Sequence, residues 1–408
     1  MTQGLKEVSS FLLGLVTVLT LLSFSIHSSK AATAEDVARL FQEKIVNGCS
    51  KIRPVMNQSD IVDVEMTLHI VSLLDVNEVQ QSVEATIWME VFWKNELMVW
   101  NPIDYGNLTL VYPPETNMWK PDLAISNGYD ALTPVGLDFV LLQSKHDGET
   151  EWNPGQKVSF LCKIDVRKFP FDTQTCYMEF FNWAGKAEET SLNYRESKYM
   201  KSAKAMYENS EWTIIEKRAE KQQPTVHEKV RVILVLQRKS LSLVLTVLLP
   251  VILLAFLNVF VFLLPTESGE KLSFSVTVLL AQAVFLSFIS GLMPQTSDST
   301  SSLSIYISVQ LILSAIYVLL TCFNLSMYHR DSNNRPIPSW LTKILCLVNI
   351  NSEDNDYPYK GNDEKLVTMT GNRVCRIIDR IYFRVFLCFV FIITLIFLCD
   401  GLSSRMLT

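Results

Sequence analysis

The sequence predicts a multidomain membrane protein in which an extracellular antiparallel β-sandwich, immunoglobulin-like in type, precedes a bundle of four transmembrane helices. Three observations predict this fold class. A short apolar leader opens the chain, apolar and polar residues alternate between about residues 62 and 238, and four long apolar segments follow. Period-two alternation is typical of half-buried strands, and a run of about 20 apolar residues is long enough to cross a bilayer.

The composition narrows the function classes. The 408 residues include 36 basic and 42 acidic side chains, hence a net charge of 36 − 42 = −6, and no basic block that would bind a nucleic acid. We find no nucleophile–base pair, metal-ligand cluster or phosphate-binding loop. The sequence therefore predicts neither an enzyme nor a metal or other cofactor.

Residues 1–32 have the pattern of a secretory signal peptide. Lys6 is followed by the apolar run Phe11–Leu22 and then by small residues up to Ala32. The alternative, a retained membrane anchor, is disfavoured because the run is short. Secretion would place the following domain where a disulfide can form.

An amphipathic helix is expected at the start of the mature chain. Thr33 with Asp36 three residues later is the pattern of a helix start, and apolar residues recur on one face as far as Ile45. Cys49 follows, for which a buried free thiol and an intermolecular bridge both stay open.

Residues 33–240 are expected to form the extracellular domain. Alternation is clearest over Val62–Ile70, Val83–Trp93 and Val230–Gln237, and turns rich in Asn, Pro and Gly separate the expected strands. Many short strands with such turns indicate a β-sandwich.

Four apolar segments follow the sandwich. Each has the length of a membrane helix, and the first three fall within residues 241–327. The segments are Leu241–Leu264, Leu272–Leu292, Leu303–Met327 and Ile381–Cys399.

The orientation of these helices follows from the leader and from two N-glycosylation sequons, which begin at Asn57 and Asn107. With the sandwich outside the cell, four crossings make residues 328–380 a cytoplasmic loop with amphipathic helical segments. Residues 381–400 are then the fourth helix, and residues 401–408 are an extracellular tail.

The second apolar segment, taken as a helix over residues 270–292, carries a narrow stripe of hydroxyl and aliphatic side chains. Copies of this helix around a water-filled axis would stack the stripe into rings, in which hydroxyls replace part of an ion's hydration and apolar rings close the pore by dewetting. A buried bundle helix whose hydroxyls bond to backbone carbonyls explains the stripe equally well. The stripe consists of Ser273, Thr277, Leu280, Val284 and Ser287.

Glu270 precedes this stripe, and two roles are open to it. It could complement the helix macrodipole, an effect of about 0.3–1 kcal/mol. In a ring of copies it would instead draw cations into the narrow cytoplasmic mouth and exclude anions. Lys271 lies about 100° further round the helix, so we expect it to point into protein or lipid headgroups.

Cys162 and Cys176 enclose thirteen residues, with the turn Phe169-Pro170-Phe171 near the centre. A disulfide between them would close a ring worth about 3 kcal/mol by the chain-entropy estimate. An aromatic–proline turn is a setting that favours a cis peptide, and its apolar tip would face something apolar, such as helix ends at a membrane. An ordinary stapled hairpin is the alternative.

This segment resembles the signature loop of the pentameric Cys-loop receptors, and the resemblance covers nearly the whole mature chain. Its other motifs are Trp88 with Trp93, Trp119-Lys-Pro-Asp122, Glu211-Trp212, Arg238, Ser268-Gly-Glu-Lys271, Met293-Pro-Gln-Thr-Ser-Asp298 and Asp379-Arg380. The most similar branch contains the nicotinic acetylcholine and serotonin type 3 receptors, which conduct cations. Anion-conducting members carry Pro-Ala where this chain has Gly269-Glu270.

The resemblance implies a pentamer of identical or homologous subunits in the plasma membrane, with the N-terminal domain outside. It also implies a Cys162–Cys176 disulfide, and a small extracellular ligand that opens a pore for Na⁺ and K⁺. An accessory subunit that binds no agonist is the alternative function.

In this family, aromatic side chains of neighbouring sandwiches hold a cationic amine. Each cation–π contact contributes a few tenths to about 2 kcal/mol of binding free energy. Trp183, seven residues after Cys176, matches the central tryptophan, and Trp88 matches the one supplied by the neighbouring subunit. Simple packing is the alternative role of both. Glu90 shares the polar face of the strand that carries Trp88 and belongs to the expected site.

The rest of the expected cage departs from the family pattern. Ser126 stands where the family has a tyrosine, and the capping loop, expected over Lys217–Lys229, contains no Tyr, Phe or Trp. His227 is its one aromatic-like side chain, either simply solvated or able to sense protons. The sequence therefore leaves two ligand classes, a cationic amine and protons.

Coupling between the sandwich and the membrane helices is expected where they join, against the linker formed by residues 293–302. An ion pair between an arginine and a carboxylate there would be partly buried, and removing one partner could cost several kcal/mol. By resemblance, the coupling residues are Glu78, Val79, Phe169, Pro170, Asp172 and Arg238.

Overall fold

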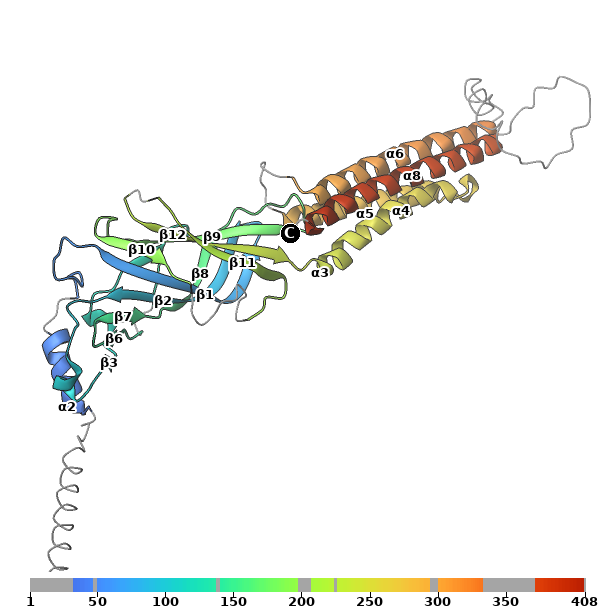
Figure 1. The fold of residues 1–408 in the computed structure, drawn as a ribbon. Helices are drawn as coiled ribbons and strands as arrows, with labels where there is room; N and C mark the ends of the chain where they lie inside the picture. Colours follow the sequence, from blue (N-terminus) through green and yellow to red (C-terminus); the bar gives the residue numbers. More distant parts are fainter. Residues whose placement is uncertain are drawn as a thin grey trace, which may run out of the picture.

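The computed structural model consists of a β-rich half and a bundle of long helices, joined end to end (Figure 1). The predicted fold class, a β-sandwich followed by four membrane-length helices, is confirmed. The structure describes residues 32–46, 50–136, 140–196, 207–223, 226–293, 300–332 and 371–406. Outside these ranges lie nearly all of the expected leader, Cys49 and most of the expected cytoplasmic loop.

The N-terminal helix begins where the sequence predicts it. Helix α2 (Ala34–Leu40) continues as a π-helical turn, η1 (Phe41–Val46). The Thr33 hydroxyl accepts a hydrogen bond from the Asp36 amide, and the Asp36 carboxylate accepts one from the Thr33 amide, which makes a capping box. Leu40 is fully buried, so the helix packs on the sandwich.

Two sheets form the sandwich. In the first, the order is β10-β1-β2-β7-β6-β3, with β8 also paired to β2; β1 and β10 are parallel. Its strands are β1 (Val62–Asn77), β2 (Ser82–Lys94), β3 (Leu110–Val111), β6 (Gln143–Lys145), β7 (Glu149–Trp152), β8 (Gly155–Leu161) and β10 (Thr190–Tyr194).

The second sheet has the order β11-β12-β9-β4-β5 and is antiparallel throughout. Its strands are β4 (Leu123–Ile125), β5 (Thr133–Pro134), β9 (Thr173–Asn182), β11 (Trp212–Lys221) and β12 (Lys229–Arg238). Two short 3-10 helices, η2 (Pro102–Tyr105) and η3 (Glu115–Asn117), lie in the connections of the domain.

The core between the sheets follows the period-two pattern of the sequence. The inward-facing apolar residues of β2 and β12 are at most 1% exposed, and each one larger than alanine contributes about 1.5–3 kcal/mol by its burial. They are Val83, Ala85, Ile87, Met89, Val91, Val230, Val232, Leu234 and Leu236. Because side chains alternate along a strand, these inward-facing residues leave Trp88 on the outer face of β2.

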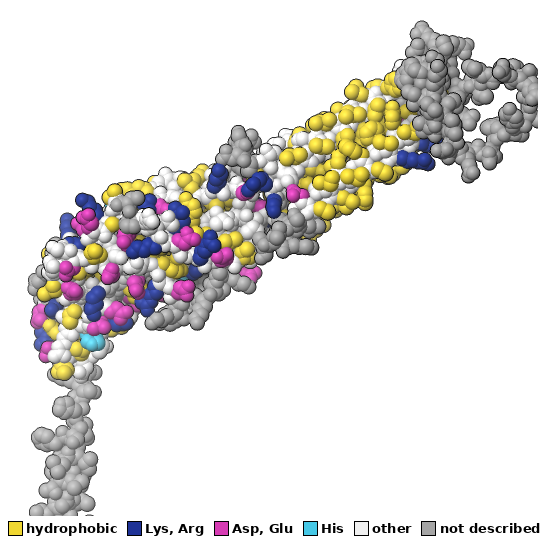
Figure 2. Space-filling view, turned by 45° about the horizontal axis from the view of Figure 1, so that its top comes forward, with side chains coloured by type: hydrophobic (Ala, Val, Ile, Leu, Met, Phe, Trp, Pro, Cys, Tyr) yellow, Lys and Arg dark blue, Asp and Glu magenta, His cyan; other side chains and the backbone are white. Residues whose placement is uncertain are grey.

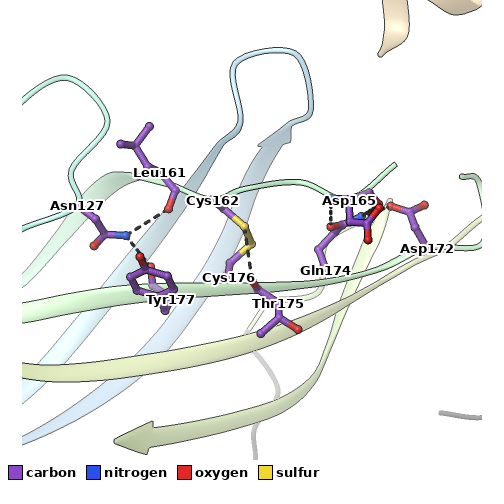
Figure 3. The surroundings of a disulfide bond; sticks show 9 residues. All are labelled: Asn127, Leu161, Cys162, Asp165, Asp172, Gln174, Thr175, Cys176 and Tyr177. Carbon is purple, nitrogen blue, oxygen red and sulfur yellow. Dashed lines mark hydrogen bonds between the residues drawn. A yellow bond between two sulfur atoms is a disulfide. The ribbon is translucent and has the colours of Figure 1, made fainter. Parts of the chain in front are cut away.

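The expected disulfide is present between Cys162, which follows β8, and Cys176 in β9 (Figure 3). It closes a loop, here called the Cys loop, that contains a cis peptide bond between Phe169 and Pro170. At the base of the loop, the Gln174 side chain accepts from the Asp165 amide and donates to the Asp165 carbonyl, both at 2.8 Å. These bonds keep the loop close to β9, from which it projects toward the helices.

Within the described residues, four helices have the length and composition to cross a membrane. The first is formed by α3 (Leu241–Leu243), η4 (Val244–Leu248), α4 (Leu249–Val259) and η5 (Phe260–Leu263). A short 3-10 turn, η6 (Thr266–Ser268), leads to α5 (Lys271–Leu292), and α6 (Ser302–Ser332) and α8 (Gly371–Met406) complete the bundle. Apolar side chains cover much of the visible bundle surface, whereas charged side chains gather on the sandwich (Figure 2).

The third and fourth helices are longer than the sequence predicted. Helix α6 continues past Met327 to Ser332, and α8 begins at Gly371, ten residues before the expected start at 381. Hydropathy marks where apolar residues end, not where helical hydrogen bonding ends. The additional turn is packed, since Val374 is fully buried beside Met327.

A buried ion pair joins three helices at the end of the bundle that lies away from the sandwich. The Lys271 ammonium at the start of α5 lies 2.6 Å from an Asp379 carboxylate oxygen of α8, and the Asn324 amide of α6 donates to the same oxygen at 2.7 Å. The side chains of Lys271 and Asp379 are 2% and 9% exposed. Lys271 thus points into protein and away from the stripe, as expected.

Replacing Asp379 with leucine would leave the Lys271 ammonium buried without a counter-charge, so we expect a loss of about 3–5 kcal/mol in stability. The double variant Lys271→Met with Asp379→Leu should recover most of this loss, because an apolar pair can substitute for a buried ion pair. Thermal unfolding of the detergent-solubilised chain would measure both effects. Equal stability of the single variant and the unmodified chain would contradict the assignment.

Candidate functional site

Two of the expected ligand residues meet around a third aromatic side chain. Trp183 lies directly after β9 and is 54% exposed, and its ring centroid is 5.6 Å from that of Phe181. His227, just before β12, packs edge-on against the same Phe181 ring at 5.6 Å, and its Nδ1 lies 2.9 Å from the Gly185 carbonyl oxygen. We call Phe181, Trp183 and His227 the aromatic cluster.

Phe181 was not predicted from the sequence. It is 7% exposed and lies in a strand whose last residues are all buried, so its pattern is that of a core residue. A phenylalanine two residues before an exposed tryptophan was the available signal, because the two side chains project from the same face of the chain.

The backbone beside Trp183 is held by the second sheet. The Trp183 amide donates to the Asp122 carbonyl at 2.8 Å, and Leu123 of β4 is paired with Asn182 of β9. The backbone at Trp183 is therefore fixed, while its side chain remains exposed.

Ser126 belongs to a charged network, not to an aromatic cage. Its hydroxyl donates to Glu179 at 2.7 Å, and the Lys229 ammonium and the Arg231 guanidinium each donate to the same carboxylate at 2.8 Å. Partial burial opposes ionisation, but the hydrogen bonds from Lys229, Arg231 and Ser126 prevail and lower the pKa of Glu179 to about 2. Glu179 was also missed, because only the β9–β12 register pairs it with Arg231.

Trp88 lies on the first sheet, where it is supported by a buried histidine. The rings of Trp88 and His69 are paired across β1 and β2 and stack at 4.7 Å. Nε2 of His69 is 3.3 Å from a carboxylate oxygen of Glu90, and the two side chains are only 1% and 7% exposed. Burial, together with the nearby Glu151, raises the pKa of Glu90, and burial with the nearby Lys217 lowers the pKa of His69.

Glu90 therefore differs from the expectation of an accessible residue on the polar face. It lies beside His69 under the outer surface and supports Trp88 from within. Trp88 and the aromatic cluster lie on different sheets, and the described contacts do not bring them together within one chain. The capping loop also differs, because Lys217–Lys221 belongs to β11 and only the residues between Lys221 and Lys229 form the connection.

At the other end of the sandwich, Arg238 gathers several of the expected coupling residues. Its guanidinium lies 2.8 Å from Asp172 and 2.7 Å from Glu78, and it stacks over Trp212 at 4.1 Å and Phe169 at 5.0 Å. The Arg238 side chain is 4% exposed. Of the remaining two expected residues, Pro170 is buried in the Cys loop and Val79 is exposed on the turn between β1 and β2.

The Cys loop touches the membrane helices. The Ser302 amide at the start of α6 donates to the Arg167 carbonyl at 3.0 Å, and the Ser302 hydroxyl donates to Asp400 of α8 at 3.1 Å. Phe171 packs so closely on Gly401 that a Cβ there would lie 2.8 Å from the ring. Residues 294–299 of the expected linker lie outside the described part of the chain.

The predicted stripe forms the uncovered face of α5. Its residues Ser273, Thr277, Leu280, Val284 and Ser287 are all exposed, with Leu280 at 64% and Val284 at 61%. The opposite face, which includes Ser275, Val278 and Gln282, is buried against the other helices. Glu270 is exposed and makes no side-chain capping hydrogen bond to the helix.

A β-sandwich that contacts the membrane-length helices α6 and α8 through a disulfide-closed loop is the arrangement of a membrane receptor with an extracellular ligand-binding domain. Two family models match this chain: the neurotransmitter-gated ion-channel ligand binding domain over residues 38–240, and the neurotransmitter-gated ion-channel transmembrane region over residues 247–350. The chain belongs to the neurotransmitter-gated ion-channel family, whose members are channels and not enzymes.

Curated relatives are named as acetylcholine receptor subunits. Subunit alpha-L1 of Schistocerca gregaria is 31% identical over 77% of this chain and 59% of its own length. Subunit beta-type unc-29 of Caenorhabditis elegans is 28% identical over 81% and 68%, and neuronal subunit alpha-4 of Homo sapiens is 30% identical over 80% and 52%. The chain thus spans between about half and two thirds of the length of these relatives.

The low pKa of Glu179 predicts a pH-dependent contribution to stability. The folded pKa of about 2 lies below the ordinary value of 4.5, so the stabilisation is complete above pH 4.5 and is lost as the pH falls toward 2. A pKa difference of this size corresponds to about 3 kcal/mol of folding free energy. Glu179→Gln should therefore unfold more easily at neutral pH, and its deficit should shrink with acidification.

Thermal unfolding of the full chain at a series of pH values measures this deficit. Glu216→Gln is the matched control, because Glu216 is half exposed on β11 of the same sheet and should change little. A deficit of Glu179→Gln that stays constant from neutral pH to pH 3 would contradict the prediction.

Proposed function

We propose that this chain is a subunit of a pentameric, cation-selective channel of the plasma membrane that an extracellular ligand opens. The observation that carries the proposal is the uncovered stripe of α5, which no other described helix of the same chain buries. In a five-fold ring, Ser273 and Thr277 would replace part of the hydration of Na⁺ or K⁺, and Leu280 with Val284 would close the pore by dewetting. Arg238 would carry the signal from the sandwich to the helices.

The proposed ligand site lies between subunits. Trp183 of one subunit would face Trp88 of the next, so that a cationic amine is held by two indole faces. Phe181 and His69 support the two walls from behind. His227 is the one ring that the capping connection adds, so we expect weak binding of simple quaternary amines, with protons as the alternative ligand.

An accessory subunit is the second candidate function. Lys229 and Arg231 share a single carboxylate beside the aromatic cluster, which leaves an excess of positive charge where a cationic ligand would bind. The matched relatives include both alpha and beta-type subunits, so the similarity is compatible with either role. Expression of the chain alone, and then with a homologous subunit, separates the two functions.

The proposed topology follows the domains expected from the sequence. Residues 1–32 would be a signal peptide, 33–240 the extracellular domain, 328–380 cytoplasmic and 401–408 extracellular. Asn57 and Asn107, the proposed glycosylation sites, are both exposed. Their modification in cells would support the orientation of the sandwich.

Removal of either indole should weaken the response to acetylcholine. We expect Trp183→Ala and Trp88→Ala each to raise the half-maximal concentration about tenfold or more, since a desolvated cation–π contact is worth up to about 2 kcal/mol. Tyr112→Ala is the control, because Tyr112 and Trp183 are equally exposed at 54%. Voltage-clamp recordings from oocytes provide the measurement, and unchanged responses in both tryptophan variants would refute the site.

Charge selection is expected to depend on Glu270. In a channel held open by Leu280→Ser, Glu270→Ala should weaken or reverse cation preference, whereas Glu270→Asp retains the charged ring and should preserve it. The reversal potential under a sodium chloride gradient reports the preference. A Glu270→Ala pore that stays fully cation-selective would leave this carboxylate without a role in selection.

A further inference from the structure

A cavity of about 550 Å³ lies behind the loop that carries Trp183. Three parts of the chain line it, namely residues within 50–58, 115–122 and 182–190. Asn182 and Ala184, which flank Trp183 in sequence, are among the lining residues, but no member of the aromatic cluster is. The cavity is therefore separate from the proposed agonist site, although it shares a loop with it.

One wall of the cavity holds a buried hydrogen-bond acceptor that has no partner. Asn182 is 6% exposed, and its Oδ1 receives no hydrogen bond in the described part of the chain. Such an unpaired buried carbonyl destabilises the fold unless another molecule supplies the missing donor. Gly185 packs closely against this amide, because a Cβ there would lie 2.3 Å from Asn182 Nδ2. In the described part of the chain, no N–H or O–H group donates to the Asn182 Oδ1.

Charged groups of both signs surround this acceptor. Glu115 and Lys120 pair at 2.9 Å and compensate each other. Arg53 uses only Nη1 in its contacts with the carbonyls of Asp60 and Glu189, at 3.0 and 3.3 Å, although a guanidinium has five N–H donors.

The two signs come from different segments. Lys51 and Arg53 belong to the segment before β1, whereas the Asp122 carboxylate belongs to the end of β4 that is paired with Asn182. The cavity thus offers cationic donors from one segment and oxygen acceptors from another.

We propose that this cavity is a second extracellular site, which binds a small zwitterion of the α-amino-acid type. Its ammonium group would donate to Asn182 Oδ1 and lie near Asp122, and its carboxylate would accept from Arg53 and Lys51. Met118 and Trp119 provide apolar surface for a short side chain. The volume lies within the range of small-molecule pockets.

Occupancy of this site acts on Trp183 through the backbone. A ligand held by Asn182 changes the position or freedom of the next residue, whose amide is bonded to Asp122. By linkage, the zwitterion and the agonist then alter each other's affinity by the same factor. This modulation rests on the proposed channel function, whereas binding to the cavity does not.

Isothermal titration of the detergent-solubilised full chain with L-alanine tests binding without reference to current. Alanine amide, which carries only the cation, and propionate, which carries only the anion, are the comparison probes. We expect saturable binding of L-alanine and binding about tenfold or more weaker for each singly charged probe, because each loses one charge-assisted contact. Absence of saturable L-alanine binding would overturn the proposal and leave the cavity to water.

Three variants locate the binding. Asn182→Ala and Lys51→Glu should each weaken L-alanine binding about tenfold or more. Lys44→Glu, an identical charge reversal at an exposed residue outside the cavity, should not change it. Lys51 is exposed, so its replacement keeps the test valid if Asn182→Ala fails to fold.

Binding that survives Lys51→Glu but is lost in Trp183→Ala would assign L-alanine to the aromatic cluster and overturn the proposal. A chain that binds L-alanine in this pattern but conducts no current, either alone or with a homologous subunit, would refute the channel function alone.

Discussion

A buried guanidinium joins the two halves of the molecule. Arg238 ends the last strand of the sandwich just before the first membrane helix, and its side chain is almost completely removed from water. A cation in this position needs close partners, because desolvation alone costs several kcal/mol. Asp172 and Glu78 provide the negative charge, and the guanidinium lies over the rings of Phe169 and Trp212. The Cys loop, the turn after β1 and the start of β11 must therefore converge on one point.

The same constraint operates at the opposite end of the bundle, where Lys271, Asp379 and Asn324 hold three helices together. The helices between the two charged clusters are mostly apolar, whereas each cluster loses several kcal/mol if one partner leaves. Packed elements held in this way change between discrete arrangements and do not deform gradually. A ligand that shifts the second sheet relative to the Cys loop would act on Arg238 first.

Sequence patterns predicted what depends on residues close together in the chain. The capping box at Thr33, the alternation along β2 and the four apolar helices need only local spacing, and each is found. The network around Glu179 and the burial of Glu90 depend instead on which strands are neighbours and in which register. The start of α8 was misplaced because a helix continues through charged residues that hydropathy assigns to a loop.

The charges beside the aromatic cluster decide how its two candidate ligands relate to each other. Glu179 compensates one of the two cations at the start of β12, so a positive charge remains two to four residues beyond His227. A proton on His227 would add a second positive charge. The His227 ring packs on Phe181, and Phe181 also contacts Trp183. Like charges at such short range repel, most strongly where water is excluded. A cationic amine on Trp183 and a proton on His227 would therefore oppose each other, so the two proposed ligands would be competitors at this site and not joint activators.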